Sequence, residues 1–143
     1  MALMKIDKIE KVDVWSGDIR NEPGGLAAAL DPLVAAGADF SFLIARRRPE
    51  DLGSGIVFLG GLRGAKQTKA ALSAGLARAD DLAGLRVEAR DKPGLVHEIL
   101  TRISSAGINL HGVSASVVGT RCVIVFAFAG TSDRDKAAQL LKK

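Results

Sequence analysis

The stretch Asp91-Lys-Pro-Gly-Leu-Val96, followed by Ala106-Gly-Ile-Asn109, decides how this chain folds. Pro93 suits the first turn of a helix, where its missing N–H needs no partner, and Gly107 suits a left-handed stop after the last turn. The apolar residues between them recur at i, i+3, i+4 and i+7, which is the spacing of one helix face: Val96, Ile99, Leu100 and Ile103. The stretch therefore predicts an amphipathic helix between two turns.

The same punctuation occurs 70 positions earlier, so the chain contains a repeat. Pro23-Gly24 matches Pro93-Gly94, and Ala36-Gly37 matches Ala106-Gly107; the same ungapped shift aligns Phe58 with Phe128. Asn21 and Asp91, just upstream of each helix, are expected to accept hydrogen bonds from its free N–H groups. Pro32 lies inside the predicted first helix, where we expect it to cause a kink that costs about 3 kcal/mol.

Each copy predicts the same order of elements, strand-helix-strand-strand-helix. The first copy gives strands at 12–19, 38–44 and 56–59 with helices at 26–33 and 65–79, and the second gives strands at 85–89, 108–116 and 121–129 with helices at 96–103 and 133–141. This order is the ferredoxin-like unit. We therefore predict an α+β fold of two ferredoxin-like (βαββαβ) modules, residues 1–80 and 81–143, each an antiparallel sheet with its helices on one face.

The last strand of the ferredoxin-like unit is missing from both copies. The N-terminus has a surplus instead, because residues 3–10 precede the first expected strand. We hypothesise that this extra strand fills a vacant sheet edge, in its own chain or in a partner.

Composition excludes several classes of protein. The 143 residues carry a formal net charge of only +4, which does not require a nucleic-acid partner. One cysteine excludes internal disulfides and a cysteine-based zinc site, and two histidines leave little for a metal. No apolar run is long enough to span a membrane, and the charged start does not resemble a secretory signal. We therefore expect a cytoplasmic protein with no membrane, nucleic-acid or metal partner.

No catalytic motif is present. The glycine-rich segment Gly60–Lys66 lacks the Gly-Lys-Ser/Thr of a phosphate-binding loop. There is no Gly-x-Ser-x-Gly elbow and no His-Glu-x-x-His motif. The sequence therefore predicts no catalytic residue, no cofactor and no enzymatic activity.

The two Pro-Gly turns and the Gly-Ile-Asn turn resemble those of the ACT-domain family. In that family a strand runs into Asp/Asn-x-Pro-Gly, an amphipathic helix follows, and Gly-Ile/Val-Asn leads into the next strand. Asp91–Gly94 with Gly107-Ile-Asn109 follows this pattern, and Asn21–Gly24 with Gly37-Ala-Asp39 follows it with two changes, Ala38 and Asp39. The resemblance implies a tandem ACT protein that binds a free amino acid, forms a homodimer or higher homo-oligomer, and regulates an enzyme.

The resemblance also implies where the ligand lies. Amides at the start of each helix would receive a carboxylate, because helix N-termini carry unpaired donors and partial positive charge. Asn109 and His111 would complete the site. The expected ligand-binding residues are Asp91, Gly94, Leu95, Val96, Asn109 and His111 in the second copy, and Asn21, Gly24, Gly25, Leu26 and Asp39 in the first. Asp39 would repel a carboxylate, although it could receive an ammonium group, and Pro32 interrupts the helix. The second copy is therefore the stronger candidate.

Other interpretations stay open at this stage. The Pro-Gly turns can simply start helices, and Asn109 and His111 can be structural. The chain can be a dimerisation module, or a regulatory subunit of a separate enzyme, without any small ligand. An RNA-recognition module shares the order of elements, but Val123 and Val125 stand where its third strand needs stacking aromatic residues.

Overall fold

The computed structural model describes residues 5–142 and divides the chain into two compact units. One unit is continuous, from Asp13 to Ala79, and we call it the inserted unit. The other combines the residues up to Val12 with those from Asp80 onward, and we call it the split unit. None of the helices in residues 5–142 is long and apolar enough to cross a membrane.

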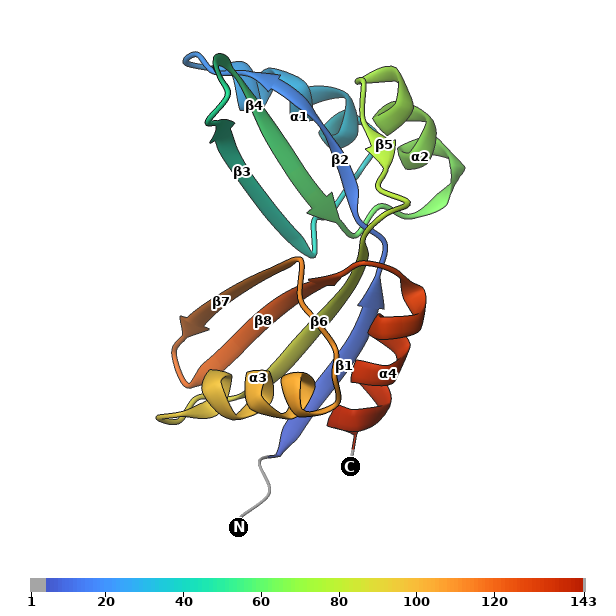
Figure 1. Cartoon of the computed structure of the whole chain (residues 1–143). Helices are drawn as coiled ribbons and strands as arrows, with labels where there is room; N and C mark the ends of the chain where they lie inside the picture. The colour runs from blue at the N-terminus through green and yellow to red at the C-terminus, as the bar shows by residue number, and fades with distance from the viewer. Residues whose placement is uncertain (1–4, 143) are drawn as a thin grey trace. The chain divides into compact units, whose positions relative to one another are not determined.

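The inserted unit is a four-stranded antiparallel sheet with two helices on one face (Figure 1). Its elements are β2 (Trp15–Arg20), α1 (Gly25–Ala35), β3 (Phe42–Arg48), β4 (Asp51–Gly60), α2 (Gly64–Ser73) and β5 (Ala77–Arg78), and the strand order is β3-β4-β2-β5. Alternate residues of the strands face the helices, so that Trp15, Val57 and Leu59 pack with Leu33 of α1 and Ala71 of α2.

The split unit has the same architecture. Its elements are β1 (Ile6–Val12), β6 (Ala83–Arg90), α3 (Leu95–Ser105), β7 (Gly112–Val118), β8 (Arg121–Phe128) and α4 (Thr131–Leu141), and the strand order is β1-β6-β8-β7. The core side of β8 contributes Cys122, Ile124, Phe126 and Phe128, all at most 1% exposed. Burial raises the pKa of the Cys122 thiol, as expected for a cysteine that packs as a small apolar group. Both units confirm the predicted α+β fold.

Strand β1 completes the sheet of the split unit. It runs antiparallel to β6, beside it in Figure 1, and Ile6 and Ile9 pack against the core beneath. Lys11 also forms an ion pair of 3.0 Å with Asp135 of α4. The surplus N-terminal strand therefore fills a vacant edge in its own chain, which is one of the two expected alternatives. The expected boundary at residue 80 differs from the observed division, because this strand belongs with the residues after it.

Glycines with positive φ end three of the helices. Gly37 (φ 85°) and Gly107 (φ 77°) follow α1 and α3, as the sequence predicts. Gly75 (φ 86°) follows α2, and the amide of Leu76 donates back to the carbonyl of Ala71 (2.9 Å). The predicted helix over residues 65–79 was therefore too long, and its last part forms the short strand β5 instead.

The two copies differ by three residues in their hairpins. Arg20 and Arg90 hold equivalent positions before the two Pro-Gly turns. Arg90 lies opposite Arg121, whereas Arg20 lies opposite Ser54, which is three residues beyond the partner that a 70-residue shift predicts. The ungapped 70-residue alignment is therefore wrong along β4. Phe58, which it matched to the buried Phe128, is only half-buried and alternates with the buried Val57 and Leu59.

Candidate functional site

The turn between β6 and α3 places open backbone donors at one end of the split unit's sheet. Gly94 takes a left-handed conformation (φ 83°) that a residue with a Cβ adopts only with strain. The amide of Leu95 donates to the carbonyl of Lys92 (3.2 Å), and the first helical hydrogen bond joins Glu98 to Gly94 (2.9 Å). Within residues 5–142, no acceptor meets the amides of Val96 and His97. Of the expected donors, Leu95 is therefore already used, while Val96 is open.

The turn between β2 and α1 repeats this backbone geometry. Gly24 has a φ of 82°, and the amide of Gly25 donates to the carbonyl of Glu22 (3.0 Å). The amides of Leu26 and Ala27 meet no acceptor among the described residues. Helix α1 continues through Pro32, whose missing N–H leaves the carbonyl of Ala28 without its usual helical donor.

The side chains of the two Asx residues behave differently. Neither caps its helix, contrary to expectation. Asn21 donates from Nδ2 to the carbonyl of Leu52 (2.5 Å), so its side chain is engaged within the inserted unit. The carboxylate of Asp91 forms no hydrogen bond or ion pair with the part of the chain described.

Asn109 and His111 lie at the opposite end of the same sheet. The amide of His111 donates to the carbonyl of Ala127 (2.9 Å), whereas the amide of Asp91 donates to that of Thr120 (2.8 Å), at the other end of β8. Helix α3 separates the two ends by 11 residues, about 16 Å at 1.5 Å per residue. One module therefore does not bring Asn109 or His111 to its own Pro-Gly turn. Asp39 is separated from Gly24 by α1 in the same way.

Strand β7 forms the outer edge of the split unit's sheet and, among residues 5–142, pairs only with β8. It carries no charged residue over Gly112–Val118. Three of its valines are exposed: Val113 (48%), Val117 (54%) and Val118 (70%). An open edge of this kind offers unpaired backbone groups to another strand. Our prediction from the sequence did not include these residues.

The matching edge of the inserted unit is β3, and it is basic. Arg46 and Arg47 are exposed near its end. Arg48 forms ion pairs with Asp18 and with Glu50 (3.6 Å), and Asp18 raises its pKa above the ordinary value. Charged side chains on an edge strand discourage pairing with another sheet.

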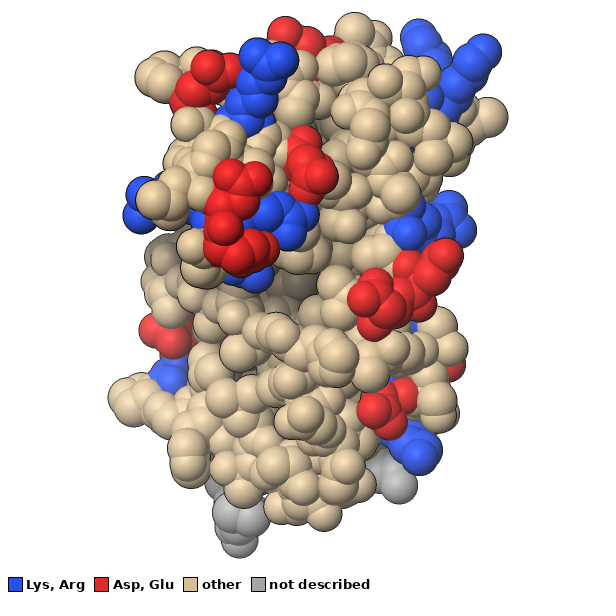
Figure 2. Space-filling model, turned by 45° about the horizontal axis from the view of Figure 1, so that its top comes forward, with Lys and Arg blue, Asp and Glu red and all other residues tan. Residues whose placement is uncertain are grey.

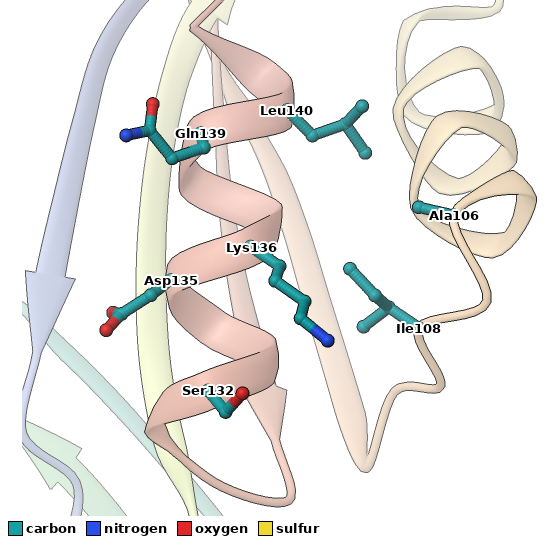
Figure 3. A pocket seen from close by; sticks show the side chains of 7 residues that line it. All are labelled: Ala106, Ile108, Ser132, Asp135, Lys136, Gln139 and Leu140. Atoms are coloured by element: carbon teal, nitrogen blue, oxygen red, sulfur yellow. The ribbon is translucent and has the colours of Figure 1, made fainter.

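A groove of about 630 Å³ lies between the end of α3 and helix α4 (Figure 3). Its apolar part consists of Ala106, Ile108 and Leu140, and Lys136 reaches across it toward Ile108. No predicted ligand-binding residue lines this groove, so it is separate from the Pro-Gly turn. Among residues 5–142 no cluster of histidine, cysteine and acidic residues is arranged to hold a metal ion.

The charged residues are mixed on the face shown in Figure 2, where acidic and basic side chains are interspersed. On β6, a hydrogen bond from Arg86 lowers the pKa of Glu88, and Lys8 and Arg121 act in the same direction. Arg121 also pairs with Asp7 of β1 at 2.5 Å. These pairs connect the three strands β1, β6 and β8 on the solvent face of the sheet.

Comparison with solved structures identifies the fold over nearly the whole chain. A Bacteroides thetaiotaomicron protein, BT0572, superposes with a TM-score of 0.75 at 17% identity, covering 94% of this chain and 88% of that one. The regulatory subunit of aspartate kinase from Thermus thermophilus gives 0.68 at 13% identity, covering 99% and 97%. Escherichia coli aspartokinase III gives 0.60 at 12% identity, covering 99% of this chain and 34% of that one.

No curated protein matches the sequence. The family model of the ACT domain matches residues 84–143, which begin in β6 and include the Pro-Gly turn, α3, the β7–β8 hairpin and α4. The inserted unit repeats this order of elements and the same strand order, with β5 in the position that β1 takes in the split unit. Residues 84–143 match the ACT domain, and the inserted unit has the same order of elements and the same strand order, so the chain is built as two modules of one fold.

Proposed function

We propose that this chain is a non-catalytic regulatory protein that binds a free amino acid at a seam between two copies of itself. The ACT domain and the regulatory aspartate kinase structures support a regulatory role. One aspartokinase structure of the same fold was solved in complex with lysine and aspartate.

The observation that carries the proposal is the separation of the two halves of the motif. The open amides of Val96 and His97 lie at one end of the split unit's sheet, and Asn109 and His111 lie at the other. Antiparallel pairing of two β7 edges reverses one sheet relative to the other. It would therefore place Asn109 and His111 of one copy at the same end as the Pro-Gly turn of the other, and create two equivalent sites.

The sequence of β7 is suited to this pairing because Val113-Ser-Ala-Ser-Val117 reads the same in both directions. A two-fold axis at Ala115 sets Val113 opposite the partner's Val117 and Ser114 opposite the partner's Ser116. Exposed valines would then pack across the seam, on the same face of the joined sheet. Strand β3, the matching edge of the inserted unit, carries the exposed Arg46 and Arg47, and charged side chains on an edge strand discourage such pairing.

The chemistry of the seam fits an amino acid. The amides of Val96 and His97, at the positive end of the helix dipole, would receive the α-carboxylate. The free carboxylate of Asp91 would receive the ammonium group. The partner's Asn109 can both donate and accept, so it would orient either group.

A thermal-shift screen of the twenty amino acids, followed by calorimetry, tests the ligand. A ligand present at about 100 times its Kd should add about 2.7 kcal/mol to the free energy of unfolding. A flat screen with a stable dimer would contradict amino-acid binding and favour a module that serves only for assembly.

The substitution Ala115→Lys tests the seam. It places two ammonium groups face to face at the proposed two-fold axis, so we expect the dimer to dissociate and amino-acid binding to be lost together. Val34→Lys is the control, because Val34 is 60% exposed on helix α1 and far in sequence from β7. Light scattering coupled to gel filtration measures the assembly. A dimer that survives Ala115→Lys would refute the β7 seam.

A further inference from the structure

We infer that each chain binds one amino acid, at the turn Asp91–Gly94, and that the turn Asn21–Gly24 is a closed structural element. This assignment rests on the proposed function and adds which of the two Pro-Gly turns binds the amino acid. The two turns share their backbone geometry, so the difference lies in their side chains and in the hairpins beside them.

The first difference is the side chain that begins each turn. The Nδ2 of Asn21 donates to the carbonyl of Leu52, and its amide donates to the carbonyl of Gly53 (3.2 Å), so both donors face the β3–β4 hairpin. At the corresponding position of the split unit, only the amide of Asp91 is engaged, and its carboxylate is free for a cation among the residues described. Of the two turns, only that of the split unit therefore offers an ammonium group a carboxylate that is unpaired among the residues described, since Glu22 is paired with Arg20.

The second difference is the length of the hairpin. Three additional residues in the hairpin of the inserted unit bring Leu52 and Gly53 beside Asn21, where the split unit has Thr120, in the turn before β8. Arg20 and Glu22 form an ion pair of 3.6 Å on the same turn. The turn Asn21–Gly24 is therefore stabilised by contacts within the inserted unit, from its own side chains and from the hairpin.

The third difference is the other half of the motif. Asp39 stands in place of Asn109 and brings a negative charge that would repel the α-carboxylate of a ligand at the turn. The neighbouring edge strand β3 carries Arg46 and Arg47, which oppose the strand pairing that would bring a second copy's residues to the turn. Both halves of a second site are therefore unfavourable in the inserted unit.

Gly24 and Gly94 offer a matched experiment. Their φ angles are 82° and 83°, and a Cβ added at either would meet no atom within 4 Å. Gly24→Ala and Gly94→Ala should therefore lower the melting temperature by similar amounts, a few degrees at most. We expect Gly94→Ala to weaken binding of the amino acid that gives the largest thermal shift by about tenfold or more, whereas Gly24→Ala leaves its Kd within about twofold.

Calorimetry on the intact dimer then gives the stoichiometry, expected at one amino acid per chain. Asn21→Ala should lower the melting temperature without changing the Kd, and Asp91→Ala should weaken binding without lowering the melting temperature. Two amino acids per chain, or equal losses of affinity from Gly24→Ala and Gly94→Ala, would overturn this assignment and leave the proposed function intact. No heat with any of the twenty amino acids would overturn both.

Discussion

Single residues set the turns of this protein, and the sequence predicted those whose effects are local. Gly37 and Gly107 end their helices as expected, because a left-handed residue after the last turn is a local requirement. The role of Asn21 was not predictable, because its partner Leu52 lies 31 residues away. Leu95 was expected to bind a ligand through its amide, but the carbonyl of Lys92 closes a turn there first.

Glu88 makes the stability of the split unit depend on pH. Its folded-state pKa is lowered from 4.5, first by the hydrogen bond from Arg86, so the fold favours the ionised carboxylate. The resulting stability is present above the unfolded pKa and is lost as the pH falls through the folded value. Glu88→Gln should therefore be less stable than the native chain at about pH 7, and the difference should close as the pH falls through the folded-state pKa of Glu88. Urea unfolding over a series of pH values measures this; a difference that persists in acid would show that the carboxylate's charge is not the cause.

At the scale of elements, hydrophobic periodicity predicted the order of strands and helices but not their registers. Helices α1 and α3 were found because each presents one apolar stripe. The register of β4 was missed, because a hairpin three residues longer shifts every later residue to another partner without changing the local pattern. The residues of strand β5 were predicted as part of the preceding helix, because a strand of two residues is too short to show an alternating pattern.

Strand β1 is the element on which the split unit depends. Deleting residues 1–12 removes the whole edge paired with β6 and the packing of Ile6 and Ile9 against the core. We expect a loss of at least about 3 kcal/mol in the free energy of unfolding. Chemical denaturation of the truncated and native chains provides the measurement. An unchanged midpoint would mean that β1 contributes little to the stability of the sheet.

At the scale of the whole molecule, the sequence indicated two modules but not that one is inserted into the other. The repeat was visible because both copies keep their Pro-Gly turns and glycine stops. The insertion was not predictable, because long-range strand pairing leaves little trace in a single sequence. The alternation of apolar and polar residues in β1 does not indicate which of the two modules the strand joins. The site residues remain a prediction from the sequence, and their separation by helix α3 became evident only from the sheet topology.

The inserted unit is continuous in sequence, and the split unit is not. A fragment of residues 13–79 contains all four strands of its sheet and should fold alone, with cooperative thermal unfolding. Residues 80–143 should not fold unless Ile6–Val12 is joined to them through a flexible linker. Circular dichroism of the three polypeptides tests this. Cooperative unfolding of residues 80–143 without the added strand would contradict it.

The nested connections have a consequence for cleavage of the chain. Two segments of the chain connect the modules: Asp13-Val14, and residues 79–82. A protease that cuts at residue 80 leaves β1 on the fragment that contains the inserted unit. Strand β1 remains hydrogen-bonded to β6 of the other fragment. The two pieces would migrate together in a native gel and part only when denatured, so scission between these modules does not release either one.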